Sequence, residues 1–122
     1  MARKILLIDD DNALLTLNAM FFSLNGFETS TCCNGQEALE LIPTLQPDII
    51  VMDLIMPVMD GNNFLSNLGL RKDGREYPVI VLSGVKQSEI SNEVIQRQNI
   101  EIIHKPVDPE ELLKKINIRL PD

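Results

Sequence analysis

The sequence is poor in aromatic side chains, in histidine and in positive charge. Its 122 residues include no tryptophan, one tyrosine and one histidine, so a core has to be built mainly from aliphatic side chains. The 18 acidic residues outnumber the 11 lysines and arginines, which leaves a formal net charge of −7. Because nucleic acids and anionic membranes are bound through a basic face, we expect neither as a direct partner.

Long apolar runs are also missing. The first run covers only residues 5–8, which is too short for the core of a signal peptide. No run approaches the roughly 20 residues that a membrane-spanning helix needs. We therefore expect a cytoplasmic protein without a membrane anchor.

Cysteine is limited to one adjacent pair, Cys32 and Cys33. The pair could form a strained disulfide or half of a metal site, but no Cys or His cluster supports a metal and the only histidine is His104. We favour the simpler interpretation, in which both thiols are small buried hydrophobic groups.

What the sequence does contain is a regular alternation of strand-like and helix-like segments. The expected strands are residues 4–9, 27–33, 48–54, 77–83 and 100–104. The expected helices are residues 13–25, 35–46, 61–70, 87–98 and 108–120. Five strands, each followed by a helix, predict one α/β domain over residues 1–122, built as a doubly wound parallel sheet with helices on both faces. The flavodoxin-like strand order 2-1-3-4-5 is the expected one.

One face of the first expected helix can be proposed from its apolar spacing. The residues that share this face are Leu14, Leu17, Phe21 and Phe22. On this assignment Leu15 lies at the edge of the buried face, either as a scattered surface residue or as part of a contact site.

Chemically active side chains stand where four of the expected strands end. They are Asp9, Asp10 and Asp11 after the first strand, Asp53 after the third, Ser83 after the fourth and Lys105 after the fifth. In the expected order these ends meet beside the topological switch point, where such folds bind ligands. Two carboxylates about 4 Å apart repel by roughly 4 kcal/mol at an effective dielectric near 20. A bound Mg²⁺, which takes carboxylate and phosphate oxygens as ligands, would explain the crowding.

The residue types also suggest their roles in phosphoryl transfer. Asp53 leaves the most buried expected strand and can attack phosphorus as a carboxylate nucleophile. Lys105 can pair with Asp53 at rest and with the phosphoryl oxygens afterwards. Ser83 can donate a hydrogen bond to a phosphoryl oxygen, so that positioning and electrostatics provide the catalysis.

Four short motifs, in order and each at a strand end, resemble the receiver domains of the two-component response-regulator family, including chemotaxis regulators. They are LLIDDD, DLIMPVMDG from Asp53 to Gly61, VLSG at 81–84 and HKPV at 104–107. The resemblance covers essentially the whole chain. It implies a phosphorylation-dependent switch that receives its phosphoryl group from a histidine kinase or a histidine phosphotransfer protein and acts on an unknown downstream protein. Such a receiver is not an enzyme in the usual sense, since it only phosphorylates and dephosphorylates itself weakly.

Further roles follow from the resemblance. It implies that Asp53 is the phosphoacceptor and that Asp9, Asp10 and Asp53 hold Mg²⁺ together with the backbone carbonyl of Ile55. Ser83 matches the family's conserved hydroxyl residue.

Lys105 matches the conserved lysine of the family, and the Lys105–Pro106 bond is expected to be cis. The chain departs from the family at Ile102, where receivers usually carry a Phe or Tyr that turns inward on phosphorylation. Ser83 and Ile102 are therefore the expected switch residues, but Ile102 lacks the aromatic ring that usually carries the conformational change. Leu14, Leu15, Pro106 and Val107 are expected to form the patch that meets the kinase or phosphotransfer partner.

Other interpretations remain open. A receiver-fold adaptor could act through constitutive contacts without phosphorylation, although the intact site argues against it. A phosphatase of the haloacid-dehalogenase type needs a second Asp two residues after its nucleophile, where this chain has Ile55. Asp11 is interpreted as a turn or cap residue, Gly61 as a turn residue only, and His104 as structural.

Overall fold

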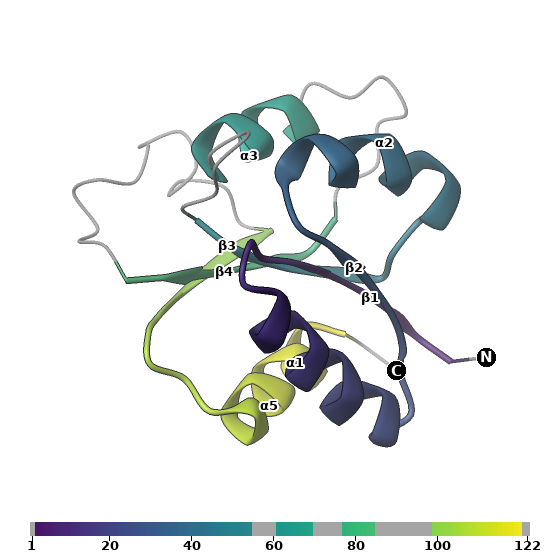
Figure 1. Cartoon of the computed structure of the whole chain (residues 1–122), viewed down its shortest axis with the longest axis vertical. Coiled ribbons are helices and arrows are strands. Elements are labelled where there is room, and N and C mark those ends of the chain that lie inside the picture. The colour runs from purple at the N-terminus through teal and green to yellow at the C-terminus, as the bar shows by residue number, and fades with distance from the viewer. Residues whose placement is uncertain (1, 55–60, 70–76, 85–98, 121–122) are drawn as a thin grey trace.

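The computed structural model describes residues 2–54, 61–69, 77–84 and 99–120. Its strands are β1 (Lys4–Ile8), β2 (Glu28–Cys32), β3 (Ile49–Asp53), β4 (Val79–Ser83) and β5 (Ile100–His104). Its helices are α1 (Asn12–Leu24), α2 (Gly35–Leu45), α3 (Gly61–Gly69) and α5 (Pro109–Arg119). All strand pairs are parallel and the sheet order is β2-β1-β3-β4-β5, which confirms the predicted topology (Figure 1). The helix expected at 87–98 lies outside the described residues.

The sheet is a middle layer between two helical layers. Helices α2 and α3 cover one face, and α1 and α5 cover the other (Figure 1). The alternating side chains of the strands divide the core accordingly. Leu6, Ile8 and Met52 pack on the α2 and α3 side, whereas Leu7 and Val51 pack on the α1 and α5 side.

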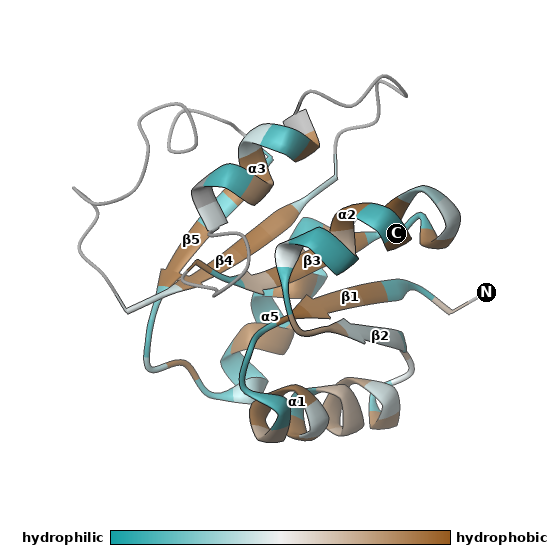
Figure 2. Ribbon diagram, turned by 45° about the horizontal axis from the view of Figure 1, so that its top comes forward, coloured by the Kyte–Doolittle hydropathy of each residue, from teal (hydrophilic) through white to brown (hydrophobic). Residues whose placement is uncertain are grey.

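The central strands are the most apolar part of the fold, as the brown ribbons of Figure 2 show. β3 and β4 are buried over nearly their whole length. Such strands are typical of parallel sheets that are covered on both faces. None of the described helices is long and apolar enough to cross a bilayer.

The orientation of α1 differs from the prediction. Leu15 is only 6% exposed and belongs to the core with Phe22, whereas Leu17 is 65% exposed. The prediction was wrong because α1 carries apolar residues around its whole circumference, so spacing alone does not show which side meets the sheet. Leu15 therefore cannot belong to a surface patch.

The cysteine prediction holds for one of the two residues. Both thiols are free, with Cys32 buried and Cys33 exposed. Neighbouring side chains at the end of a strand point to opposite sides, so β2 turns one thiol inward and the next outward. Cys33 lies beside Glu37, with Sγ 3.4 Å from the Oε2 atom. The expectation that both are buried was wrong for Cys33.

Candidate functional site

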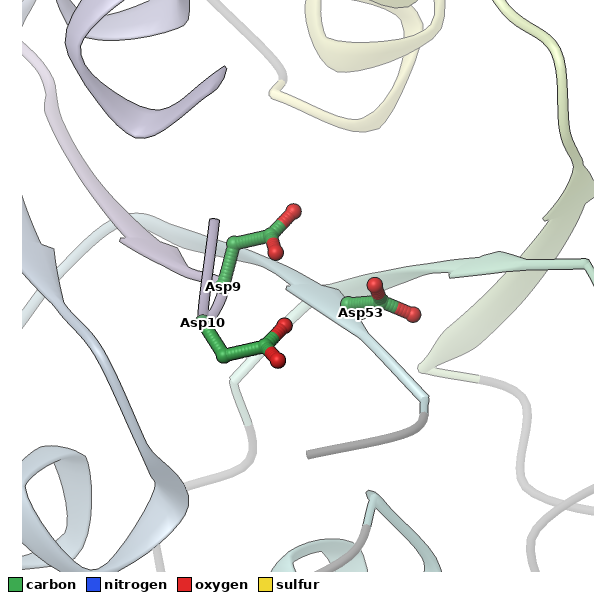
Figure 3. A group of neighbouring side chains, drawn as sticks. All are labelled: Asp9, Asp10 and Asp53. Atoms are coloured by element: carbon green, nitrogen blue, oxygen red, sulfur yellow. The ribbon is translucent and has the colours of Figure 1, made fainter. Parts of the chain in front are cut away.

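Three carboxylates meet at the carboxyl ends of β1 and β3. Asp9 and Asp10 directly follow β1, and Asp53 is the last residue of β3. Ile8 is in register with Met52, which brings Asp9 level with Asp53 across the two adjacent strands. Each residue offers a carboxylate oxygen that lies within 4.8 Å of those of the other two. Figure 3 shows Asp9 and Asp10 extending toward the side on which Asp53 lies.

Without a bound cation, the burial of Asp9 beside other carboxylates disfavours its charged form. Asp9 is 6% exposed, and burial raises the pKa of its carboxyl group. The backbone N–H of Asp11 donates to Asp9 Oδ1 at 3.0 Å and opposes the shift, while the charge of Asp53 adds to it. A carboxylate that is both desolvated and close to like charges is a suitable ligand for a hard cation.

Lys105 reaches the cluster from β5, an outermost strand of the sheet. It follows β5, and its Nζ atom lies 2.8 Å from Asp53 Oδ2. Burial alone would lower the pKa of Lys105, but the hydrogen bond and charge of Asp53, with the charges of Asp9 and Asp10, outweigh it and raise the pKa. The ammonium group is therefore held in its charged form beside Asp53.

Ser83 and Lys105 are neighbours through the backbone. Ser83 ends β4 and is fully buried, and its carbonyl accepts a hydrogen bond from the N–H of Lys105 at 2.9 Å. The preceding residue, Leu82, is in register with Asp53, so Ser83 lies at the same edge as the carboxylates. The Lys105–Pro106 peptide bond is cis, as expected.

Asp11, the third of the consecutive acids after β1, has a structural role. Asp11 is the N-cap of α1, and its carboxylate accepts a hydrogen bond from the N–H of Leu14 at 3.1 Å. This confirms the interpretation of Asp11 as a cap.

Gly61 contributes more than the sequence indicated. It is the buried first residue of α3, and its N–H donates to the carbonyl of Leu54, the residue after Asp53. A Cβ atom at Gly61 would lie 2.5 Å from Leu54 O and 2.7 Å from Leu54 Cα. The turn-only interpretation was therefore wrong: glycine is needed for close backbone approach beside the site. The sequence carries no direct signal for this contact, because it depends on how the start of α3 packs back against the end of β3.

The structure places the predicted docking residues and the predicted switch residue Ile102 in different regions. Leu14, Pro106 and Val107 line one cavity of about 260 Å³ between α1 and the start of α5, which we call the α1–α5 groove. Lys105 is also part of its wall. Ile102 is half-buried and packs against the core cluster on the α2 and α3 side. Ile55 lies outside the described residues.

Comparison with known proteins identifies relatives along most of the chain. The model of the response regulator receiver domain matches residues 5–117. Among curated proteins, the regulatory protein AtoC of Escherichia coli is 33% identical over 109 residues, which are 89% of this chain and 23% of AtoC. A protein-glutamate methylesterase/protein-glutamine glutaminase of Syntrophomonas wolfei is 36% identical, over 97% of this chain and 37% of that protein.

Solved structures agree with this match. The chemotaxis response regulator CheY4 of Vibrio cholerae superposes with a TM-score of 0.86 at 27% identity, covering 98% of this chain and 100% of that one. The receiver domain of the Francisella response regulator 1452 is 32% identical, with a TM-score of 0.79 and coverage of 97% and 96%. The chain spans only about a quarter to a half of the length of the curated relatives it matches.

Proposed function

Because the chain belongs to the response regulator receiver domain family, we propose that it is a phosphorylation-controlled signalling switch whose phosphoacceptor is Asp53. The phosphoryl group would come from the phosphohistidine of a histidine kinase or a histidine phosphotransfer protein. The observation that carries this proposal is the contact of Asp53 with Lys105 at 2.8 Å, beside two further carboxylates at the same sheet edge.

The donor set suits Mg²⁺. Asp9, Asp10 and Asp53 provide carboxylate oxygens within 4.8 Å of one another, and Mg²⁺ commonly uses one or two carboxylates together with phosphate oxygens and water. We propose these three residues as ligands, with the Ile55 carbonyl as a fourth donor that lies outside the described residues. When bound, the ion would neutralise negative charge on the carboxylates and on the incoming phosphoryl group.

The chain's own residues provide the other parts of the reaction. An Asp53 carboxylate oxygen attacks phosphorus, so that a P–O bond forms while the P–N bond to the donor histidine breaks and the electron pair stays on the imidazole. Lys105, already 2.8 Å from Asp53 Oδ2, is placed to bind an oxygen of the transferred group. Ser83 is the candidate hydroxyl donor to a second phosphoryl oxygen, since it ends the adjacent strand.

Loss of the phosphoryl group would follow the same geometry. Water attacks phosphorus and the Asp53 carboxylate leaves, which gives the slow self-dephosphorylation of a switch rather than the turnover of an enzyme. Ser83 and Ile102 are the proposed switch residues. Ile102 packs against apolar neighbours and has no hydroxyl, so we expect it to transmit only a weak conformational change.

The α1–α5 groove is the proposed docking site for the phosphodonor protein. Its wall combines the apolar side chains of Leu14, Pro106 and Val107 with Lys105 of the site. A partner seated there would lie beside Lys105, whose Nζ atom is 2.8 Å from Asp53 Oδ2. The downstream partner of this chain is a separate protein or a further part of a longer chain, since the curated relatives are longer and one of them is named as a DNA-binding transcriptional regulator. For residues 1–122 themselves, with a net charge of −7, we propose no direct contact with nucleic acid.

The test is phosphorylation by a small donor. Incubation with acetyl phosphate and Mg²⁺ should add one phosphoryl group per chain, stable in acid and labile in base, as intact-mass measurement can show. Asp53→Asn should abolish this labelling, because an amide is a poor nucleophile.

The matched control is Asp11→Asn, which makes the same change in an acid that caps α1 outside the cluster. This variant should be labelled like the unmodified protein. If Asp53→Asn were still labelled to the same stoichiometry, Asp53 would not be the phosphoacceptor.

A further inference from the structure

Asn18 is a polar residue on the sheet-facing side of α1. It stands three positions after Leu15 and four before Phe22, the two residues of α1 that are buried. Residues with this spacing share one face of a helix, so Asn18 lies in the row that packs on the sheet, where apolar side chains are usual. Asn18 itself is half-buried. Leucine would suit this position better, because asparagine is a weaker helix former and its amide needs hydrogen-bond partners.

A small hollow connects Asn18 with the carboxylates of the candidate site. It has a volume of about 10 Å³ and is lined by Asp9, Asp53 and Asn18 together with apolar residues of the core. Side chains alternate along a strand, so Asp9 and Asp53 project to the same side of the sheet as Leu7 and Val51, which is the α1 and α5 side. Figure 3 agrees, since the Asp9 carboxylate extends toward the faint purple and yellow ribbons of α1 and α5.

The hollow has the size and the polarity to hold one water molecule. A volume of about 10–15 Å³ is enough for a buried water, which typically makes about three hydrogen bonds. The three polar side chains in the wall offer that number. Ionised carboxylates only accept hydrogen bonds and an amide N–H₂ donates. One water can therefore donate a proton to Asp9 and another to Asp53 while it accepts an N–H of Asn18.

The surroundings of Asn18 favour this arrangement. Among the residues that the structure describes, none forms a hydrogen bond with the Asn18 amide. Apart from Asp9 and Asp53, the other lining residues of the hollow are apolar. Buried polar groups without a protein partner usually bind ordered water instead, so a water in the hollow is the partner that the chemistry of the wall provides.

We propose that Asn18 is a positioning residue of the phosphorylation site, which holds one water molecule between the Asp9 and Asp53 carboxylates. An ionised carboxylate has about four acceptor sites, so the water occupies one on each residue and leaves others for Lys105 and for a cation. The water would restrict rotation of the two carboxylates and reduce their mutual repulsion, so that less ordering is needed when a cation binds. The inference rests on the proposed function, because it takes Asp9 and Asp53 as metal ligands.

Binding of Mn²⁺, followed through the EPR signal of the free ion, tests this role. Asn18→Leu removes the N–H donor and should raise the Kd for Mn²⁺ about tenfold, as the loss of a residue that orients metal ligands commonly does. Asn18→Gln keeps the amide, and the α1–α5 groove, which Asn18 also lines, has room for the longer side chain. Its Kd should stay within about threefold of the original value.

The matched control is Asn117→Leu, the same change at an exposed residue of α5 that is not part of the hollow. It should leave the Kd within about twofold of the original value. An unchanged Kd in Asn18→Leu would overturn the proposal. So would equal losses of affinity in Asn18→Leu and Asn117→Leu, or in Asn18→Leu and Asn18→Gln.

Thermal unfolding in EDTA separates positioning from a purely structural role. Asn18→Leu should unfold at the same or a higher temperature than the unmodified chain, because leucine suits the apolar wall of the hollow. A lower Tm that accompanies the weaker Mn²⁺ binding would show that Asn18 only supports the fold, and would overturn the proposal.

A high-resolution crystal structure of the unmodified chain tests the water directly. It should show one water within hydrogen-bond distance of Asn18 Nδ2 and of the Asp9 and Asp53 carboxylates, and a dry hollow would overturn the proposal. Failure of the proposed function has a different signature. If Asp53→Asn still accepted a phosphoryl group, Asp53 would not be the phosphoacceptor, whereas Mn²⁺ binding and the water would still decide the role of Asn18.

Discussion

Replacing Asp10 with asparagine should stabilise the metal-free protein. At the 4.8 Å that bounds the oxygen separations in the cluster, two carboxylates repel by about 0.9 kcal/mol in bulk water and about 3.5 kcal/mol at an effective dielectric of 20. Asp10 is exposed, so the lower figure is the better guide for its repulsion with Asp9. The repulsion with Asp53 is largely cancelled by Lys105, 2.8 Å from that carboxylate.

The expected gain is therefore about 1 kcal/mol in the free energy of unfolding, or a rise of about 4 °C in Tm for a domain of this size. Urea and thermal unfolding in EDTA, followed by far-UV circular dichroism, measure it. Saturating Mg²⁺ should reverse the order of stability, because the unmodified protein then gains more from binding.

Asp11→Asn is the control, since it removes the same charge one residue away. Asparagine caps a helix about as well as aspartate, so the cap of α1 should survive. A less stable Asp10→Asn protein, or an equal gain in Asp11→Asn, would refute the view that crowded carboxylates destabilise this site.

Three further predictions concern packing, pH and the conformational response. Gly61→Ala should lower the free energy of unfolding by about 1–3 kcal/mol in urea titrations, because its Cβ would overlap the Leu54 backbone. Gly84→Ala meets nothing within 4 Å and should stay within about 0.5 kcal/mol of the original value, so an equal loss would show that the contact at Gly61 is unimportant. Burial raises the pKa of the Cys32 thiol from 9.0 to about 11, so its contribution to stability is present below pH 9 and is lost as pH rises toward 11. Relative to Cys32→Ala, the protein should lose about 2–3 kcal/mol over this interval, and parallel pH profiles of the two proteins would contradict the shift. With the phosphate mimic beryllofluoride, amide exchange in α5 should change little, because Ile102 lacks the aromatic ring of most receivers. Strong new protection throughout α5 would show that an aliphatic residue suffices.

Much of this protein follows from local sequence alone. The strand-like runs alternate with helical segments, which predicts a parallel sheet with right-handed helical crossovers. The order β2-β1-β3-β4-β5 was expected as the common choice for such doubly wound folds, and the structure has it. The candidate site was predictable for the same reason. Once the strands are parallel, residues that follow their carboxyl ends meet at one edge, as Asp9, Asp53 and Lys105 do. The role of Asp11 as a helix cap was also predictable from the sequence, since capping depends on residues only three positions apart.

Other features depended on how the helices and strands pack against one another. Apolar spacing did not show which side of α1 meets the sheet, because both sides are apolar, and only packing buries Leu15 and leaves Leu17 exposed. Likewise, the requirement for glycine at Gly61 comes from the backbone of Leu54, which α3 approaches only in the folded chain. Sequence determined the order of the elements and the chemistry at their ends, because these depend on neighbouring residues. Tertiary structure decided which faces are buried, because burial depends on what each element packs against.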